Sequence, residues 1–192
     1  MEQTLENHHS EKMTLGFWIY LMTDLIMFAA LFATYAVLRG NTFGGPSGRE
    51  LFSLPFVLGE TMILLTSSFT CGLAMIGAHR VKKNLAITWF TITFLLGVSF
   101  LTMELYEFSH LIAEGHGPGA SAFLSSFFTL VGTHGLHIAI GLLWIIVSIA
   151  MIWLRGLTSE VVNKLTRLSL FWHFLDVVWI FIFTIVYLYG HV

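Results

Sequence analysis

The residues of this sequence that could do chemistry are ionisable side chains placed inside long apolar runs. Six lie well within such runs and two stand close by: Asp24, Glu60, Glu104, His137, His173 and Asp176, with Glu107 and His134. A charged side chain at the centre of a membrane helix costs about 2.5 to 3.5 kcal/mol on insertion scales. Each of these groups therefore requires a partner or a function.

Histidines in two of the runs suggest a metal or haem site. His134 and His137 stand three residues apart, and His173 lies in the next run. Imidazoles on membrane helices are common haem ligands, so this set is compatible with a bound metal. Gly135 and Ala139 favour another interpretation, because small residues four apart allow a close helix contact in which the histidines only form hydrogen bonds.

The acidic side chains also allow two interpretations. Asp24 and Asp176 could form a proton relay or face a neighbouring subunit, or they could join helices through hydrogen bonds with the carboxyl group neutral. His173 and Asp176 stand three apart on one helix face, where a carboxylate can fix the imidazole tautomer. We favour the structural interpretation in both cases.

Hydroxyl side chains are concentrated in one run. Thr66, Ser67, Ser68 and Thr70 precede Gly72, a pattern that favours interhelical contacts over a polar pore lining. The sequence contains no GxxxxGK[ST], GxSxG or HExxH motif. We therefore predict no catalytic residue, no cofactor-binding residue and no metal ligand in this chain.

Long apolar helices must position these groups, and the composition indicates a membrane protein. Of 192 residues, 56% are hydrophobic and 10% are charged, whereas soluble domains average about 25% charged. Five apolar runs are long enough to cross a hydrocarbon core of about 30 Å as helices: residues 15–38, 54–78, 85–106, 123–154 and 168–189. We predict an all-α, polytopic bundle of five transmembrane helices, forming one membrane domain over residues 15–192.

The predicted helices place the polar groups at two depths. Measured from the centre of each run, Asp24 and Asp176 lie about 4 Å to one side of the midplane, and His137 lies close to it. On the same scale Glu60 and Glu104 lie roughly 9 and 13 Å towards the opposite side. The sequence thus predicts a layer near the middle and a second layer nearer one surface.

Loop charges predict the orientation of the bundle. Alternate loops place seven basic residues on one side and two on the other: Lys12, Arg80, Lys82, Lys83, Arg155, Lys164 and Arg167 against Arg39 and Arg49. The positive-inside rule then places the tail of residues 1–14 in the cytoplasm and the C-terminus in the periplasm. That tail lacks the basic region of a signal peptide. The net charge of −2 excludes nucleic-acid binding, and a single cysteine excludes an internal disulfide.

Several blocks of the sequence resemble subunit III of the haem-copper terminal oxidases. The blocks are FWHFLDVVWIFIFTIVYLYG at 171–190, FFTLVGTHGLHIAIG at 127–141, GFWIYLMTDLIMFAALFATY at 16–35, ETMILLTSSFT at 60–70 and LGVSFLTMELYEF at 96–108. They occur in the family's order, and the resemblance as a whole extends over about nine tenths of the chain. Many members of the family have seven helices in this subunit, whereas this sequence has five, and it carries Asp24 where the family usually carries a glutamate. In these respects it resembles the bacterial quinol oxidases of the cytochrome bo type. The segments GGPSGRELFSLPFVLGE at 44–60 and GLTS at 156–159 also resemble this branch.

The resemblance implies a subunit without redox centres in the bacterial cytoplasmic (inner) membrane. Haems and copper would belong to subunit I, the main partner, with subunits II and IV as further partners and ubiquinol as the substrate of the complex. The implied role is to stabilise subunit I and to support proton uptake, while phospholipid fills a cleft between two arms of helices. Candidate lipid contacts are Thr66, Ser67 and Arg80, because hydroxyl and basic groups can hold an anionic headgroup.

Two other functions remain open from the residues alone. A proton-coupled transporter could use Asp24 and Asp176, and a haem-carrying membrane anchor could use His134, His137 and His173. A transporter is expected to show internal repeats and helices broken near the midplane, and the sequence shows neither.

Overall fold

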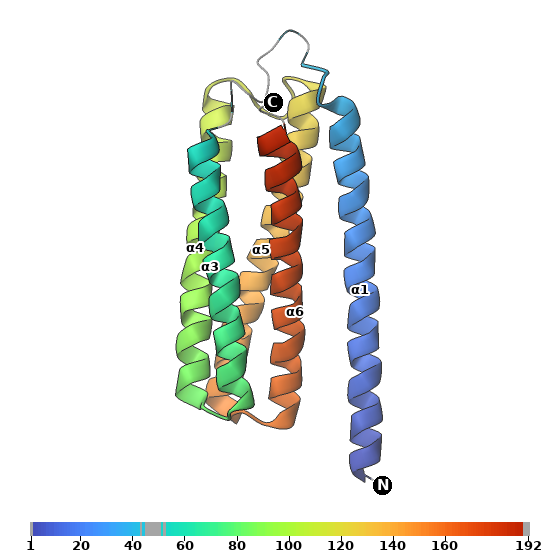
Figure 1. The fold of residues 1–192 in the computed structure, drawn as a ribbon, viewed down its shortest axis with the longest axis vertical. Coiled ribbons are helices and arrows are strands. Elements are labelled where there is room, and N and C mark those ends of the chain that lie inside the picture. Colours follow the sequence, from blue (N-terminus) through green and yellow to red (C-terminus); the bar gives the residue numbers. More distant parts are fainter. Residues whose placement is uncertain (1, 43, 45–50, 52, 190–192) are drawn as a thin grey trace.

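The computed structural model describes residues 2–42, 44, 51 and 53–189 and consists of long helices (Figure 1). The helices are α1 (Glu2–Leu38), α3 (Leu54–His79), α4 (Lys83–Ala113), α5 (Ala122–Arg155) and α6 (Ser159–Ile182), which continues as a π-helix, η1 (Phe183–Leu188). Five segments are long and apolar enough to cross a membrane. The predicted all-α bundle of five membrane helices is therefore confirmed, and the chain is a multi-pass membrane protein.

Four of the helices surround a common core, and the fifth packs against one edge. Contacts join α3 to α4, α4 to α5, α5 to α6 and α6 to α3, while α1 contacts α5 and α6 (Figure 1). Short connections at 80–82 and 156–158 make successive helices antiparallel. The two ends of the chain lie at opposite ends of the bundle, as five crossings require. The connections beside Lys82 and Arg155 lie at the end of the bundle where α1 begins. That this end faces the cytoplasm stays a prediction.

Several helices extend beyond the apolar runs from which they were predicted. The last one begins at Ser159 and not near residue 168, because Thr158 caps it by accepting a hydrogen bond from the Val161 backbone N–H (3.4 Å). An ion pair between Glu160 and Lys164 (3.0 Å) supports its exposed first turns. Charges end a membrane span but not a helix, so the apolar runs underestimated helix length.

The first helix shows the same difference. It begins at Glu2 and continues through residue 15 without a break, so the backbone does not separate the predicted tail from the predicted span. The division at residue 15 stays a prediction about the membrane boundary. Arg49 lies outside the described residues, as do residues 45–50 and 52 of the segment 44–60 that resembles the quinol-oxidising branch.

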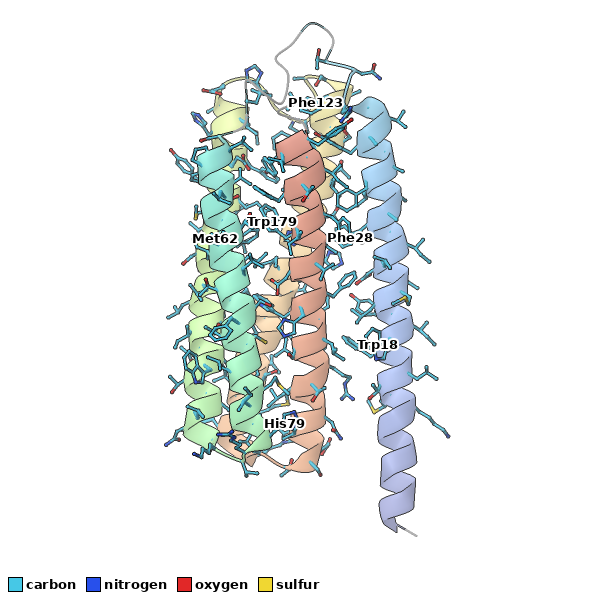
Figure 2. All side chains as sticks on the ribbon, in the orientation of Figure 1. Trp18, Phe28, Met62, His79, Phe123 and Trp179 are labelled. Carbon is cyan, nitrogen blue, oxygen red and sulfur yellow. The ribbon has the colours of Figure 1, made fainter. Side chains whose placement is uncertain are left out.

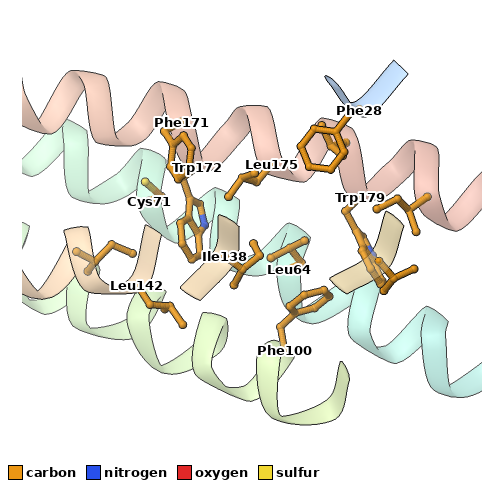
Figure 3. Packing of buried hydrophobic residues seen from close by; sticks show 14 of the residues in the cluster. Phe28, Leu64, Cys71, Phe100, Ile138, Leu142, Phe171, Trp172, Leu175 and Trp179 are labelled. Carbon is orange, nitrogen blue, oxygen red and sulfur yellow. The ribbon is translucent and has the colours of Figure 1, made fainter. Parts of the chain in front are cut away.

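The centre of the bundle is built around a tryptophan held between two glycines. A Cβ added at Gly97 of α4 or at Gly141 of α5 would lie 2.9 Å from the Trp172 ring of α6. Both positions therefore require glycine if three helices are to meet around this indole. Figure 3 shows Trp172 beside Leu142 and Phe171 in the buried cluster. Its Nε1 donates a hydrogen bond to Ser67 Oγ of α3 (3.2 Å), which links a third pair of helices.

Candidate functional site

The predicted site residues form three groups, of which the first joins α1 to α5. Asp24 is buried on α1, and its Oδ2 lies 3.7 Å from Nε2 of His137. The other ring nitrogen of His137 donates to the Thr133 carbonyl of its own helix (2.7 Å), which orients the imidazole. The Phe28 ring packs against the same imidazole, 5.4 Å away (Figure 2). Asp24 thus faces a histidine of its own chain.

The second group joins α3 to α6. Ser68 Oγ lies 2.7 Å from Nδ1 of His173, within hydrogen-bond distance. Asp176 Oδ2 is farther from the same nitrogen, at 3.6 Å, and no hydrogen-bond partner of either Asp176 carboxyl oxygen is found among the described residues. The prediction that Asp176 fixes this imidazole is therefore only partly right. The pair does share a helix face, but the closer partner is a hydroxyl on another helix.

The third histidine is separated from the other two. His134 is fully buried, and its Nε2 donates to the Leu175 carbonyl of α6 (3.2 Å). Its ring lies between Phe100 and Trp179, at 5.9 and 5.1 Å. The three histidines therefore turn to three different partners. Within the described residues no group of three His, Cys, Asp or Glu side chains is placed to hold a metal ion.

A third group lies near the end of the bundle where α1 ends, which we call the C-side. It consists of three carboxyl groups that interact electrostatically, Glu60 of α3 with Glu104 and Glu107 of α4. Glu60 and Glu104 are almost completely buried. The Tyr187 hydroxyl of η1 donates to Glu107 Oε2 (2.8 Å), whereas both Glu60 oxygens lack a partner among the described residues. Adjacent buried carboxyl groups are destabilising unless protons or water join them.

A glycine of α5 makes room for this C-side cluster. A Cβ added at Gly135 would collide with the carboxyl group of Glu104. Gly135 does lie at a close contact between α4 and α5, as its pairing with Ala139 suggested. The close neighbour is an acidic side chain, and no feature of the glycine's own sequence context indicates which group will fill the space.

The hydroxyl residues of α3 mostly form the predicted interhelical contacts. Ser67 donates to the Thr93 carbonyl of α4 (3.2 Å), and Thr70 bonds the Thr93 hydroxyl (2.8 Å). Sequence reasoning missed a further contact, from Trp179 Nε1 to Thr61 Oγ1 (3.0 Å). The presence of an indole N–H in the sequence is the only signal that could have suggested this contact with a hydroxyl group.

The three candidate lipid contacts are placed differently. Ser67 is fully buried and bonded within the bundle, so the prediction that it contacts lipid is wrong. Thr66 is exposed near the middle of α3, with its hydroxyl bonded to the Met62 carbonyl of its own helix. Arg80 is exposed at the end of α3, beside the turn that carries Lys82.

The fold and its buried groups define the class of protein as a bundle of membrane helices with polar side chains that bond neighbouring helices or the backbone of their own helix. A profile of the family described as cytochrome c oxidase subunit III matches residues 1–191. The chain therefore belongs to this family, which confirms the resemblance found in the sequence.

Named relatives cover nearly the whole chain. It is 63% identical over 175 residues to the cytochrome bo(3) ubiquinol oxidase subunit 3 of Pseudomonas aeruginosa, covering 91% of this chain and 84% of the relative. It is 56% identical to the protein of the same name in Pseudomonas putida, covering 95% and 89%. It is also 50% identical to the cytochrome c oxidase subunit 3 of a Bacillus species, covering 93% and 86%.

Proposed function

We propose that this chain is the non-redox subunit III of a proton-pumping haem-copper quinol oxidase in the bacterial inner membrane. The observation that carries the proposal is the 63% identity to a ubiquinol oxidase subunit 3 over most of both chains. The Bacillus relative is named for cytochrome c, so membership of the family does not by itself decide the electron donor. We propose ubiquinol because the two relatives above 55% identity carry that name.

The geometry of the histidines supports a role without redox centres. The three histidines face three different partners: His134 bonds the backbone of α6, His137 lies against Asp24, and His173 bonds Ser68. The described residues hold no group of three potential metal ligands. We assign the haems and copper of the complex, and its catalysis, to subunit I.

The buried polar contacts support a structural role beside subunit I, with subunits II and IV as further partners. Asp24 and His137 join α1 to the other helices, and Ser68 and His173 join α3 to α6. A subunit held rigid in this way can stabilise its neighbour and keep the entry of a proton pathway in place. Support of proton uptake would follow from that stabilisation.

Bound phospholipid is a further part of the proposal. Arg80 and Lys82 are exposed at one end of the bundle, where they can attract an anionic headgroup. Large apolar side chains such as Ile26 and Phe69 are exposed along the helices and suit acyl chains. Mass spectrometry of the purified complex is expected to find retained anionic phospholipid, with less of it in an Arg80→Ala variant. Equal retention in both would contradict this assignment.

The proposed function is tested by purifying the tagged chain from native membranes in mild detergent. We expect haem-containing subunits to co-purify and the preparation to oxidise ubiquinol with oxygen. The separately expressed chain is expected to show no Soret band. A Soret band that disappears in a His137→Ala variant, or the absence of any haem-containing partner, would contradict the proposal.

A further inference from the structure

Buried polar atoms without a partner are concentrated in the C-side cluster of Glu60, Glu104 and Glu107. Glu60 is completely buried, and neither of its carboxyl oxygens has a hydrogen-bond partner among the described residues; Oε2 of Glu104 lacks one as well. The Tyr187 hydroxyl has a single proton, which it donates to Glu107. Buried polar groups in folded proteins are nearly always bonded to protein or to ordered water. The cluster therefore requires further hydrogen-bond donors.

A cation does not supply the missing donors. The charges that act on Glu104 come mainly from Glu60 and Glu107, which have the same sign when ionised. No set of three His, Cys, Asp or Glu side chains in the described part of the chain could hold a metal ion. Like charges at short range cannot all ionise, so carboxyl groups that share a buried site hold at least one proton between them.

A histidine on the neighbouring helix also lacks a hydrogen-bond donor. The Glu104 carboxyl group lies against Gly135 of α5, and His134 is the residue before that glycine. Nε2 of His134 donates to the Leu175 carbonyl (3.2 Å), so Nδ1 is an acceptor, and it has no partner among the described residues. Water or a protonated carboxyl group can donate to this atom, whereas an ionised carboxylate cannot.

Titratable side chains lead from the cluster to the C-side surface. Glu104, Glu107, His110 and Glu114 follow one another along α4 at intervals of three or four residues, so they lie along one side of the helix. Glu104 is buried and Glu107 half-buried, whereas the side chains of His110 and Glu114 are 61% and 50% exposed. His110 Nε2 lies 3.4 Å from Glu114 Oε1. Acid and base groups spaced in this way can transfer protons between outside water and the buried cluster.

Towards the middle of the bundle, aromatic rings end this route. Phe100 stands one turn before Glu104 and is fully buried, and its ring meets that of Trp179 edge to face at 4.7 Å (Figure 3). His134 lies between these two rings, and its Nε2 is bonded to the Leu175 carbonyl, a group that cannot pass a proton on. Along the described residues of α4, the titratable groups therefore connect the cluster to the C-side.

We propose that Glu60, Glu104 and Glu107 form a proton-binding site that holds water and at least one shared proton and exchanges this proton with the C-side of the membrane. A proton from C-side water binds to His110 or Glu114, passes along α4 to the cluster and leaves by the same route. The proposal goes beyond a structural role. It depends on residues of this chain alone, so it does not rest on the electron donor or the partners of the complex.

The first test detects the bound proton by infrared spectroscopy of the complex purified through the tagged chain. A protonated carboxyl group has a carbonyl band that is separate from the carboxylate bands and that shifts in D2O. We expect this band to lose intensity in Glu60→Gln, in Glu104→Gln or in both. Glu160→Gln is the matched control, because Glu160 is exposed on α6 and paired with Lys164, and it should leave the band unchanged. A band that neither cluster substitution changes would overturn the proposal.

The second test uses the wild-type complex, so it does not depend on the assembly of a variant. A high-resolution density map should show water bound between Glu60 and Glu104, and metal analysis should find no ion bound to the cluster. Density for a metal ion at this position would overturn the proposal, and so would carboxyl groups packed together without water and without a protonated-carboxyl band.

The third test examines the route to the surface. The purified complex is transferred into D2O, and the shift of the protonated-carboxyl band is followed in time. In the double variant His110→Leu and Glu114→Gln we expect the exchange to slow by at least about tenfold, because a positioned acid or base group accelerates proton transfer by ~100-fold or more. Ser109→Ala is the control, since Ser109 is exposed on the same helix and its hydroxyl bonds the Tyr106 carbonyl. Equal exchange rates in the wild type, the control and the double variant would overturn the proposal.

Discussion

The middle and the C-side of the bundle bury similar polar side chains in different ways. In the middle, Asp24 lies against His137 and Ser68 against His173, so each contact joins two helices through unlike groups. On the C-side, Glu60, Glu104 and Glu107 lie together; the phenol of Tyr187 donates to Glu107, and both Glu60 oxygens lack a hydrogen-bond partner among the described residues. The middle therefore pairs unlike groups across helices, with Asp24 Oδ2 close to His137 but without a hydrogen-bond partner among the described residues, whereas the C-side gathers like groups that depend on fit and on protons or water.

The difference predicts how each region responds to substitution. In the middle, a substitution that breaks an unlike pair or reverses its charge should destabilise the bundle, because the remaining partner is left buried without a partner of its own. On the C-side, a neutral amide can replace a carboxyl group without leaving an unpaired charge. Substitutions in the middle and on the C-side therefore test the two regions separately.

The largest effect is expected for Asp24→Lys. The new ammonium group would lie against His137 near the middle of the membrane, where inserting a charged residue costs about 2.5 to 3.5 kcal/mol. The substitution would also remove the contact between Asp24 and His137. We expect no assembled complex in the membrane, while Asp24→Ala assembles in reduced yield. Haem content of purified complexes measures both. Normal assembly of Asp24→Lys would show that this position is not held against His137.

A smaller effect is expected where Gly135 admits the Glu104 carboxyl group. Gly135→Ala should destabilise the complex by about 1 to 3 kcal/mol through overpacking. Gly132→Ala, one turn away, is the control, because its Cβ would meet Phe108 at an ordinary 3.5 Å. Thermal unfolding should show a lower midpoint for Gly135→Ala alone, and adding Glu104→Ala should restore part of the loss. Equal midpoints for the two alanine variants would contradict the packing.

Removing the phenol of the C-side cluster should cost about 1 kcal/mol, the usual value of one hydrogen bond. Tyr187→Phe deletes the donor to Glu107 and leaves the ring packed. Tyr106→Phe is the matched control, since Tyr106 is 64% exposed on α4. Thermal midpoints of the two complexes provide the measurement. The prediction fails if the exposed tyrosine contributes as much as the buried one.

The smallest effect is expected for Glu60→Gln. The carboxyl oxygens of Glu60 have no partner among the described residues, so an amide of the same size should leave stability unchanged or slightly raised. The same thermal assay tests this. A loss as large as that of Gly135→Ala would mean that the acid forms an essential contact and that the two regions are less different than the structure indicates.

Much of the fold and the identity of the polar groups could be predicted from the sequence. The apolar runs indicated five membrane helices, and the hydroxyl residues of α3 were correctly assigned to interhelical contacts. The partners could not be predicted, because the contact of Asp24 with His137 depends on the register between α1 and α5, for which one sequence holds no local signal. The Tyr187 contact similarly depends on the π-helical turn that ends the last span.

The position of the glycines illustrates the same limit. Gly135 was predicted as a site of close helix contact without indication that Glu104 would fill the space, and no prediction was made for Gly97 and Gly141, which enclose Trp172. Packing of the whole bundle decides which side chain fills each space. Helix ends were also misplaced, because a charged residue such as Glu160 ends an apolar run without ending the helix.

We propose that the buried polar groups of this chain hold helices and subunits in place and do not carry out oxygen reduction. Asp24→Asn tests it most directly, because the amide keeps the size of the side chain and its ability to bond His137. The measurement is the ubiquinol oxidase rate and the proton-to-electron ratio of the purified complex, followed over many turnovers. We predict full assembly and an initial rate near that of the wild type. A fully assembled complex that reduces no oxygen from its first turnover would contradict the claim and make Asp24 a proton donor in the reaction.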